Sequence, residues 1–143
     1  MDLVHFYNIK IKWTKGNEGD LSEPTLPVIH TAIAPPFPGG VPDVWSPEHL
    51  FVASINSCLM TSFLIIAGNS KLEFESYECT ARGKLEKVED KYMISEVVLK
   101  PVIKVKFEKD IERAHRMILK SENICLISNS VKTQILLEPK VIV

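Results

Sequence analysis

The segment from Leu50 to Gly68 restricts the fold more than any other part of the chain, because it is long, strongly apolar and free of charged residues. Ser46 supplies an N-cap oxygen just before it, and Glu48 complements the positive end of a helix dipole. A proline at position 47 suits the first helical turn, and Gly68 is placed to cap the carboxyl end. The pattern therefore predicts a helix over residues 47–67.

This apolar helix is expected to belong to the core of a soluble protein. Polar residues interrupt it at five positions: Ser54, Asn56, Ser57, Thr61 and Ser62. It also lacks the basic flanks and the unbroken apolar length that a membrane helix needs. The amino-terminal sequence MDLVHFYNIKIKW starts with an acid and has no basic region, which argues against a secretory signal. We therefore expect a cytoplasmic protein that does not enter a membrane.

A helix that is apolar nearly all round has to be covered on all sides. In a domain of this size a sheet covers only one side, so a second copy of the chain is the simplest cover for the rest. Small side chains would let another helix approach closely: Ala53, Ser54, Ser57 and Ser62. These features predict a homodimer with the long helices at its centre.

Length, charge and cysteine usage exclude several classes of protein. A chain of 143 residues fits one domain, residues 1–143. Its 17 basic side chains nearly balance 18 acidic ones, and no basic stripe with interleaved aromatics is present, which argues against nucleic acid as a partner. Three cysteines without CxxC spacing argue against a disulfide framework and a zinc site.

The remaining elements follow from apolar periodicity and turn residues. Five strands are predicted, over residues 3–13, 25–34, 72–88, 92–107 and 133–143. The third and fourth form an antiparallel hairpin, and a second helix over residues 111–123 begins at a capping Asp110. The loop PPFPGGVPDVW precedes the long helix, and LISNSVK can hold a short helical turn. This order predicts an α+β fold with both helices packed on antiparallel sheets.

Judged from the residues alone, the three cysteines differ in what they can do. Cys58 lies within the buried helix, where a lone cysteine usually behaves as a small hydrophobic residue. Cys125 follows the second helix in a polar junction, where a thiol can be accessible, although a single such thiol is more often inert. Cys79 lies inside a strand pattern and is expected to be structural.

Two motifs resemble those of the OsmC/Ohr family, the osmotically inducible protein C and organic hydroperoxide resistance proteins. SPEHLFVASINSCLM has the Pro-Glu-x-Leu start with a cysteine ten residues after the glutamate, and SENICLISNSVK resembles the family's second cysteine motif. The resemblance covers nearly the whole chain in element order. It implies an intertwined dimer, in which strands wrap two central helices, and a thiol-dependent peroxidase that acts in the stress response.

The resemblance also implies roles for individual residues. Cys58 would be the peroxidatic cysteine, Cys125 the resolving cysteine, and Glu48 a buried carboxylate that orients the site. The Cys58 thiolate would reduce an organic hydroperoxide, and the resulting sulfenic acid would condense with Cys125. An external dithiol, a lipoylated protein in the best-known cases, would reduce the disulfide, so neither a metal nor another cofactor is expected.

The sequence differs in two respects from a site formed within one chain by the family's usual residues. Glu48 and Cys58 are about 15 Å apart along one helix, so a shared site needs one residue from each chain. The family's amino-terminal arginine is missing. Lys15 or His49 could stabilise the thiolate in its place, although a solvated loop lysine and a surface histidine are the more ordinary interpretations.

The proline-rich loop could close over the site as an apolar lid. Phe37 and Trp45 would then meet Phe51 and Ile55 of the helix and form a pocket that favours organic hydroperoxides over hydrogen peroxide. The alternative is that the two loop aromatics only anchor the loop. Two other functions remain open at this point: a non-enzymatic dimer that binds a small apolar ligand, and a thiol redox sensor.

Overall fold

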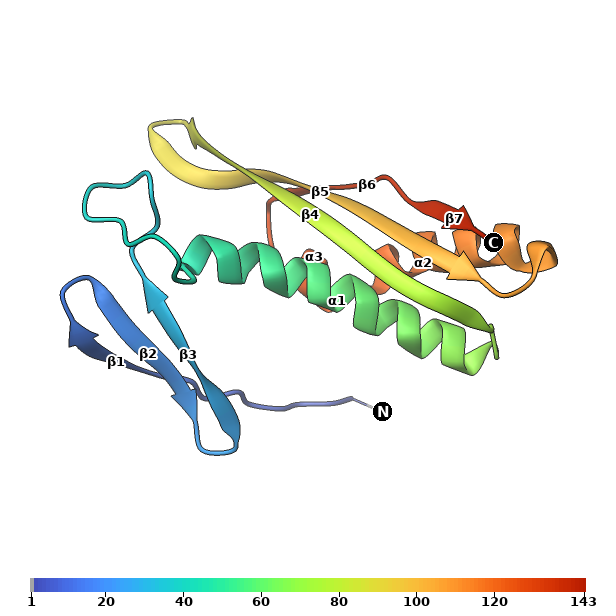
Figure 1. Ribbon diagram of the computed structural model, residues 1–143, viewed down its shortest axis with the longest axis horizontal. Coiled ribbons are helices and arrows are strands. Elements are labelled where there is room, and N and C mark those ends of the chain that lie inside the picture. The colour runs from blue at the N-terminus through green and yellow to red at the C-terminus, as the bar shows by residue number, and fades with distance from the viewer. Residues whose placement is uncertain (1) are drawn as a thin grey trace. The chain divides into compact units, whose positions relative to one another are not determined.

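The computed structural model describes residues 2–143. The chain forms two compact units, one that ends at Leu50 and one formed by Phe51–Val143. Helix α1 (Pro47–Asn69) begins at the end of the first unit and continues into the second (Figure 1). The expectation of a single domain over residues 1–143 stays a prediction.

The first unit contains a three-stranded antiparallel sheet in the order β1 (Lys10–Lys15), β2 (Glu18–Glu23) and β3 (Leu26–Ala32). The sequence predicted only two strands here, over residues 3–13 and 25–34. The segment TKGNEGD, predicted to be a loop, is instead a tight hairpin, because Gly16 adopts a φ of 50° and lets β2 start at once. Residues 2–9 precede β1 without regular structure.

Many apolar side chains of this unit are exposed. They come from the segment before β1 and from β1 and β3, and include Phe6, Ile11, Trp13, Val28 and Ile29. Every residue of β1 is exposed. So many exposed apolar side chains are unusual for a chain that acts alone, and they mark this unit as a candidate interaction surface.

Ser46 caps α1 as the sequence predicts, and His49 completes the cap. The backbone N–H of His49 donates to Ser46 Oγ at 3.2 Å, and the backbone N–H of Ser46 donates to His49 Nδ1 at 3.1 Å. This reciprocal pair is a capping box in which histidine takes the place usually held by glutamate or glutamine. The cap uses Nδ1 of His49, so the ring proton of the neutral imidazole lies on Nε2.

The carboxyl end of α1 differs from the prediction. Gly68 lies inside the helix, and the residue in the left-handed region is Lys71, with a φ of 55°. Leu72 N–H donates to the Ala67 carbonyl at 2.9 Å and Lys71 N–H to the Gly68 carbonyl at 3.2 Å. This is the Schellman arrangement, with a lysine where glycine is favoured. The hydrogen bonds that close the last turn therefore outweigh the backbone cost of a side chain at Lys71.

The second unit is built on a long hairpin, β4 (Phe74–Val88) and β5 (Lys91–Val105), as the sequence predicts. Glu89 and Asp90, with φ of 49° and 66°, form its two-residue turn. The predicted last strand is split into β6 (Gln134–Leu137) and β7 (Lys140–Ile142), and both pair parallel with β5. The sheet is therefore mixed and not purely antiparallel. Pro139 separates the two short strands because it has no N–H to donate.

Helices α1 and α2 (Ile111–Ile124) lie on the same side of this sheet (Figure 1). Alternate residues of β5, Val97, Leu99, Ile103 and Val105, form one core with apolar residues from both helices. The short helices η1 (Glu108–Asp110) and α3 (Leu126–Asn129) flank α2. Asp110 is the N-cap residue of α2 as predicted, but its side chain makes no capping hydrogen bond and instead pairs with Arg113 at 3.3 Å.

Helix α1 has the length and composition of a membrane span, but its side chains pack as those of a core helix. One face of α1 is buried in the second unit and includes Ile55, Leu59, Phe63 and Ile66. The opposite face carries three exposed apolar side chains, Met60, Leu64 and Ile65. Ser54 and Ser57 are on this exposed face as expected, whereas Ser62 is buried.

Candidate functional site

The structure brings Cys58 and Cys125 together in the second unit. Cys58 lies on α1, and Cys125 links α2 to α3 in an extended conformation that ends one helix and begins the next. The side chains of the two residues lie close enough for the Cys58 thiol to raise the pKa of Cys125. Both residues are buried, with Cys58 9% and Cys125 0% exposed, and both are free thiols.

The surroundings of Cys125 favour the neutral thiol. Burial raises the pKa of Cys125, the nearby Cys58 thiol raises it further, and the nearby Ser128 lowers it only in part. A thiol with a raised pKa is a poor nucleophile at neutral pH until a base removes its proton. Cys125 therefore needs such a base nearby if it is to attack another sulfur.

Sequence reasoning missed three polar residues beside the two thiols. Tyr77 reaches the pair from β4, and Glu122 and Ser128 flank Cys125 at the end of α2 and within α3. Burial raises the pKa of Glu122. The only sequence signal for Glu122 and Ser128 is that they lie three residues before and three residues after Cys125. This spacing has meaning only once α2 is known to end at Ile124, and Tyr77 gives no such signal.

Cys79 is the third cysteine near this site. It lies on β4 two residues from Tyr77, on the same face of the strand, and burial raises the pKa of its thiol. The side chain of Asn56 donates to the Cys79 carbonyl oxygen at 2.9 Å, which fixes β4 against α1. The structural role expected for Cys79 stays a prediction.

Lys15, Glu48 and His49 all belong to the first unit, so their predicted roles beside Cys58 stay predictions. Glu48 is in the first turn of α1 and Lys15 is an exposed residue at the end of β1. His49 has a structural role already, because its Nδ1 caps α1. Its ring also meets that of Trp45 edge to face, with centroids 6.1 Å apart.

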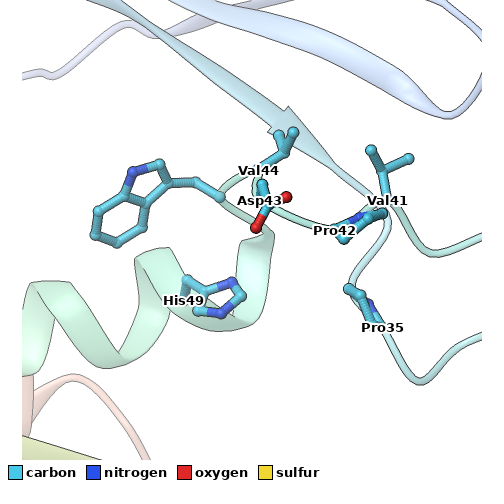
Figure 2. Close-up of a pocket in the computed structure, with 7 residues that line it drawn as sticks. Pro35, Val41, Pro42, Asp43, Val44 and His49 are labelled. Atoms are coloured by element: carbon cyan, nitrogen blue, oxygen red, sulfur yellow. The ribbon is translucent and has the colours of Figure 1, made fainter.

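A pocket of about 500 Å³ lies in the first unit, between the proline-rich loop and the start of α1 (Figure 2). Seven residues line it: Pro35, Val41, Pro42, Asp43, Val44, Trp45 and His49. Its walls are mostly apolar, with the Asp43 carboxylate and the His49 imidazole as polar groups. Trp45 therefore contributes to a pocket within its own unit.

The other predicted pocket residues are placed differently. Phe51 lines a separate pocket of about 430 Å³ in the second unit, together with Met93, Ile94 and residues 130–133. Ile55 is 0% exposed and belongs to the core. A common pocket of Phe37, Trp45, Phe51 and Ile55 draws on both units and stays a prediction.

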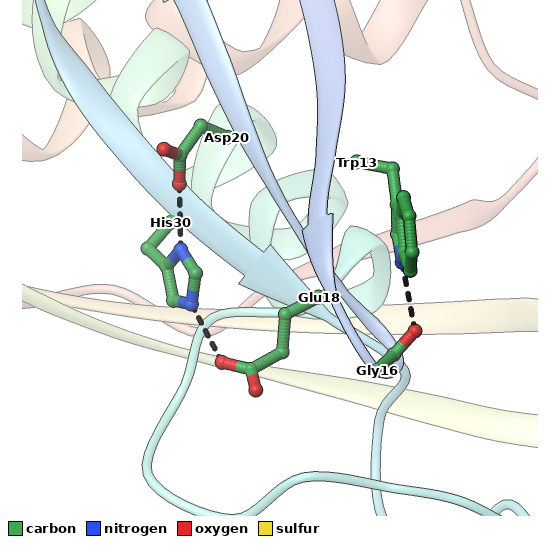
Figure 3. Close-up of polar contacts among 5 residues, drawn as sticks. All are labelled: Trp13, Gly16, Glu18, Asp20 and His30. Atoms are coloured by element: carbon green, nitrogen blue, oxygen red, sulfur yellow. Dashed lines mark hydrogen bonds and ion pairs between the residues drawn. The ribbon is translucent and has the colours of Figure 1, made fainter.

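A second titratable cluster lies on the sheet of the first unit (Figure 3). His30 Nδ1 is 2.6 Å from Asp20 Oδ1, and His30 Nε2 is 2.6 Å from Glu18 Oε1. The hydrogen bonds to Asp20 and to Glu18 raise the pKa of His30. The imidazolium thus connects the two acidic residues of β2 to β3. Within residues 2–143, no group of three or more His, Cys, Asp or Glu side chains is arranged to hold a metal ion.

A family model and a curated protein both match this chain. The model of the family described as OsmC-like protein matches residues 40–140. An uncharacterized protein from Methanocaldococcus jannaschii is 31% identical over 98 residues, which are 68% of this chain and 50% of that protein. The chain thus spans about half the length of this curated relative.

Solved structures resemble the whole chain. An OsmC-like protein of unknown function from Vibrio cholerae superposes with a TM-score of 0.85 at 25% identity, covering 95% of this chain and 99% of that one. An organic hydroperoxide resistance protein from Elizabethkingia anophelis, with thiocyanate bound, gives a TM-score of 0.75 at 22% identity and covers 98% and 99% of the two chains. An organic hydroperoxide resistance protein from Legionella pneumophila gives 0.71 at 19% identity, covering 98% and 100%.

Proposed function

Because this chain belongs to the OsmC-like protein family, we propose that it is a thiol-dependent peroxidase that reduces organic hydroperoxides. The observation that carries the proposal is the closeness of the free thiols of Cys58 and Cys125, which are 67 positions apart in the sequence (125 − 58 = 67). Two free thiols that lie close together are the arrangement that a reversible disulfide requires. Similar structures described as organic hydroperoxide resistance proteins support the choice of substrate.

The proposed reaction uses no cofactor and needs an external dithiol. The Cys58 thiolate attacks one oxygen of the O–O bond, the other oxygen leaves as an alkoxide, and the alkoxide takes a proton to become an alcohol. Cys58 is thereby oxidised to a sulfenic acid, which condenses with the Cys125 thiol to form a disulfide and water. A dithiol, for example a lipoylated protein, then reduces the disulfide and restores both thiols.

A homodimer is part of this proposal. The exposed apolar face of α1, with Met60, Leu64 and Ile65, and the exposed apolar side chains of the first unit are surfaces that a second copy would cover. In such a dimer, one chain would complete the site around Cys58 of the other chain. Its Glu48 would supply the carboxylate, and its Lys15 or His49 would supply the cation or hydrogen-bond donor. We place the protein in the cytoplasm, where dithiols remain reduced.

The test is stopped-flow oxidation of the reduced protein by cumene hydroperoxide and by hydrogen peroxide. We expect fast oxidation that prefers the organic peroxide, loss of this reaction in Cys58→Ser, and a trapped sulfenic acid in Cys125→Ser. Cys79→Ser is the matched control and should react like the wild type, because Cys79 has no part in the proposed reaction.

The same experiment separates the alternative functions. Oxidation no faster than that of a free thiol at the same pH would contradict the peroxidase and favour a dimer that binds a small apolar ligand. Oxidation followed by no turnover with dithiothreitol or dihydrolipoamide would favour a thiol redox sensor.

A further inference from the structure

We infer that the pocket of about 500 Å³ in the first unit binds a small organic ammonium ion with an apolar body. Asp43 takes the ammonium group, and Trp45 with the neighbouring prolines takes the apolar body. The inference goes beyond the proposed function, because every residue that lines this pocket belongs to the first unit and neither Cys58 nor Cys125 is among them.

The loop that forms the pocket is held in place by hydrogen bonds of its own backbone. The N–H of Val41 donates to the Ile33 carbonyl oxygen at 2.9 Å, and the N–H of Ala32 donates to the Trp45 carbonyl oxygen at 2.9 Å. These two bonds close the loop on the end of β3. A pocket whose walls are fixed before a ligand arrives loses little conformational freedom on binding.

Close packing inside the loop also keeps the pocket wall in place. A Cβ on Gly40 would lie 2.7 Å from the backbone nitrogen of Pro35, so the chain packs against Pro35 with no room for a side chain. The side chain of Asn17, from the turn between β1 and β2, donates to the Gly39 carbonyl oxygen at 3.0 Å. The loop is therefore fastened to the sheet as well as to itself.

The walls of the pocket offer apolar surface and one aromatic ring. Five of the seven lining side chains are apolar: Pro35, Val41, Pro42, Val44 and Trp45. Trp45 is 54% exposed, so part of its indole is free to contact a ligand. An indole attracts a cation through the negative face of its π-system when the cation lies within about 6 Å of the ring centre. This surface suits an apolar body that carries a positive charge.

Asp43 supplies the negative charge of the pocket. Its backbone has a φ of 64°, a left-handed conformation that aspartate tolerates better than most residues. In Figure 2 its carboxylate lies on the side of the loop that faces His49. Asp43 is exposed, and within residues 2–143 its carboxylate has neither a hydrogen bond nor an ion pair. An unpaired carboxylate and an aromatic ring in one pocket together favour an organic cation.

His49 adds no charge to the pocket. The backbone N–H of Ser46 can only donate, so the His49 Nδ1 that accepts it at 3.1 Å carries no proton. The ring is therefore neutral while the cap of α1 is intact, and Asp43 is the only ionised side chain among the seven that line the pocket. A pocket with one negative charge and no positive charge favours a cation over a neutral molecule and disfavours an anion.

Three ligands of similar size test the choice of charge: phenethylamine, a cation at pH 7, 2-phenylethanol, which is neutral, and 3-phenylpropionate, an anion. Each is titrated into the full chain, and the backbone and indole N–H signals are followed by NMR. We expect shifts in residues 35–49 and weakest binding of the anion. The amine should bind about three to thirty times more tightly than the alcohol, through the ion pair and the cation–π contact together. Equal dissociation constants for the amine and the alcohol would overturn the inference, as would shifts confined to other residues or no shift at all.

Two substitutions assign the roles of the pocket residues. Asp43→Asn removes the charge and retains a residue that accepts a left-handed backbone, so it should weaken the amine about two- to fivefold and leave the alcohol unchanged. Asp90→Asn is the matched control and should bind like the wild type, because Asp90 is an exposed aspartate with a φ of 66° in the turn between β4 and β5. Trp45→Leu should weaken the amine more than the alcohol, since leucine keeps apolar contact and loses the ring. Unchanged amine binding in Asp43→Asn would overturn the inference even if the wild-type shifts lie in the pocket.

Discussion

Gly83 of β4 faces Val52 of α1 so closely that a Cβ on Gly83 would lie 2.5 Å from Val52 Cγ2. The absence of a side chain on this strand residue therefore sets how near the helix can approach the sheet. We expect Gly83→Ala to lower the free energy of unfolding by about 1–3 kcal/mol, because the added methyl group forces Val52 or the strand to move. Urea denaturation measures the change.

A second substitution identifies the cause of this loss. Gly83→Ala should cost about 1 kcal/mol less in a Val52→Ala background, because the clashing Cγ2 is then absent. Gly68→Ala is the matched control: no atom lies within 4 Å of the Cβ it would add, so it should be neutral or stabilising. Equal losses with valine and with alanine at position 52 would show that the contact is not responsible.

Lys71 gives a prediction in the opposite direction. Its φ of 55° closes the Schellman turn after α1, and a side chain is disfavoured there. Lys71→Gly should raise the free energy of unfolding by about 0.5–1 kcal/mol. Lys71→Ala should leave it nearly unchanged, since alanine retains the Cβ, and a gain in the alanine variant would mean that the lysine charge and not the backbone is the cause.

His30 should make the stability of the first unit depend on pH. Its pKa is raised in the folded protein by Asp20 and Glu18, so its contribution is complete below the unfolded value of about 6.5 and is lost as the pH rises through the folded pKa. The difference in denaturation midpoint between wild type and His30→Gln should therefore shrink from pH 6 to pH 9. A His30 titration in NMR spectra at or below pH 6.5 would contradict the prediction.

The exposed face of α1 predicts the behaviour of a dimer variant. Ile65 is 62% exposed in the single chain, and an acidic residue there would place a charge in the proposed interface. We expect Ile65→Glu to weaken the dimer by at least about tenfold in dissociation constant, measured by sedimentation velocity across a dilution series. Leu119→Glu, on the exposed side of α2, is the matched control. A wild type that sediments as a monomer would contradict the proposed dimer itself.

The long elements were predictable because each carries a strong local pattern. Helix α1 has a cap and an uninterrupted apolar segment, and the β4–β5 hairpin has two long alternating strands around a polar turn. The short strands were not predictable. β1 and β2 are separated only by Gly16 and Asn17, so no loop marks the boundary between them. The division of the last strand into β6 and β7 depends on its pairing with β5. Asp110 resembles a helix cap in sequence, but its ion pair with Arg113 uses the side chain elsewhere.

The candidate site was predictable only in part. The motifs around Cys58 and Cys125 mark the two thiols through a family resemblance, and the fold brings them together. Tyr77 and Glu122 could not be found in this way, because a strand residue and a residue at a helix end reach the thiols only after the sheet and α2 have packed on α1. The residue types that surround a reactive pair are set by such packing and leave no local pattern in the sequence.

The closeness of Cys58 and Cys125 makes folding itself a determinant of the rate at which the proposed disulfide would form. In an unfolded chain the two sulfurs would meet only by closure of a flexible loop, which corresponds to an effective concentration of roughly millimolar. In the folded unit they are held close together, and effective concentrations of well-oriented groups exceed that value by several orders of magnitude. A protein that loses the packing of α2 on α1 therefore loses the speed of its disulfide formation before it loses either thiol.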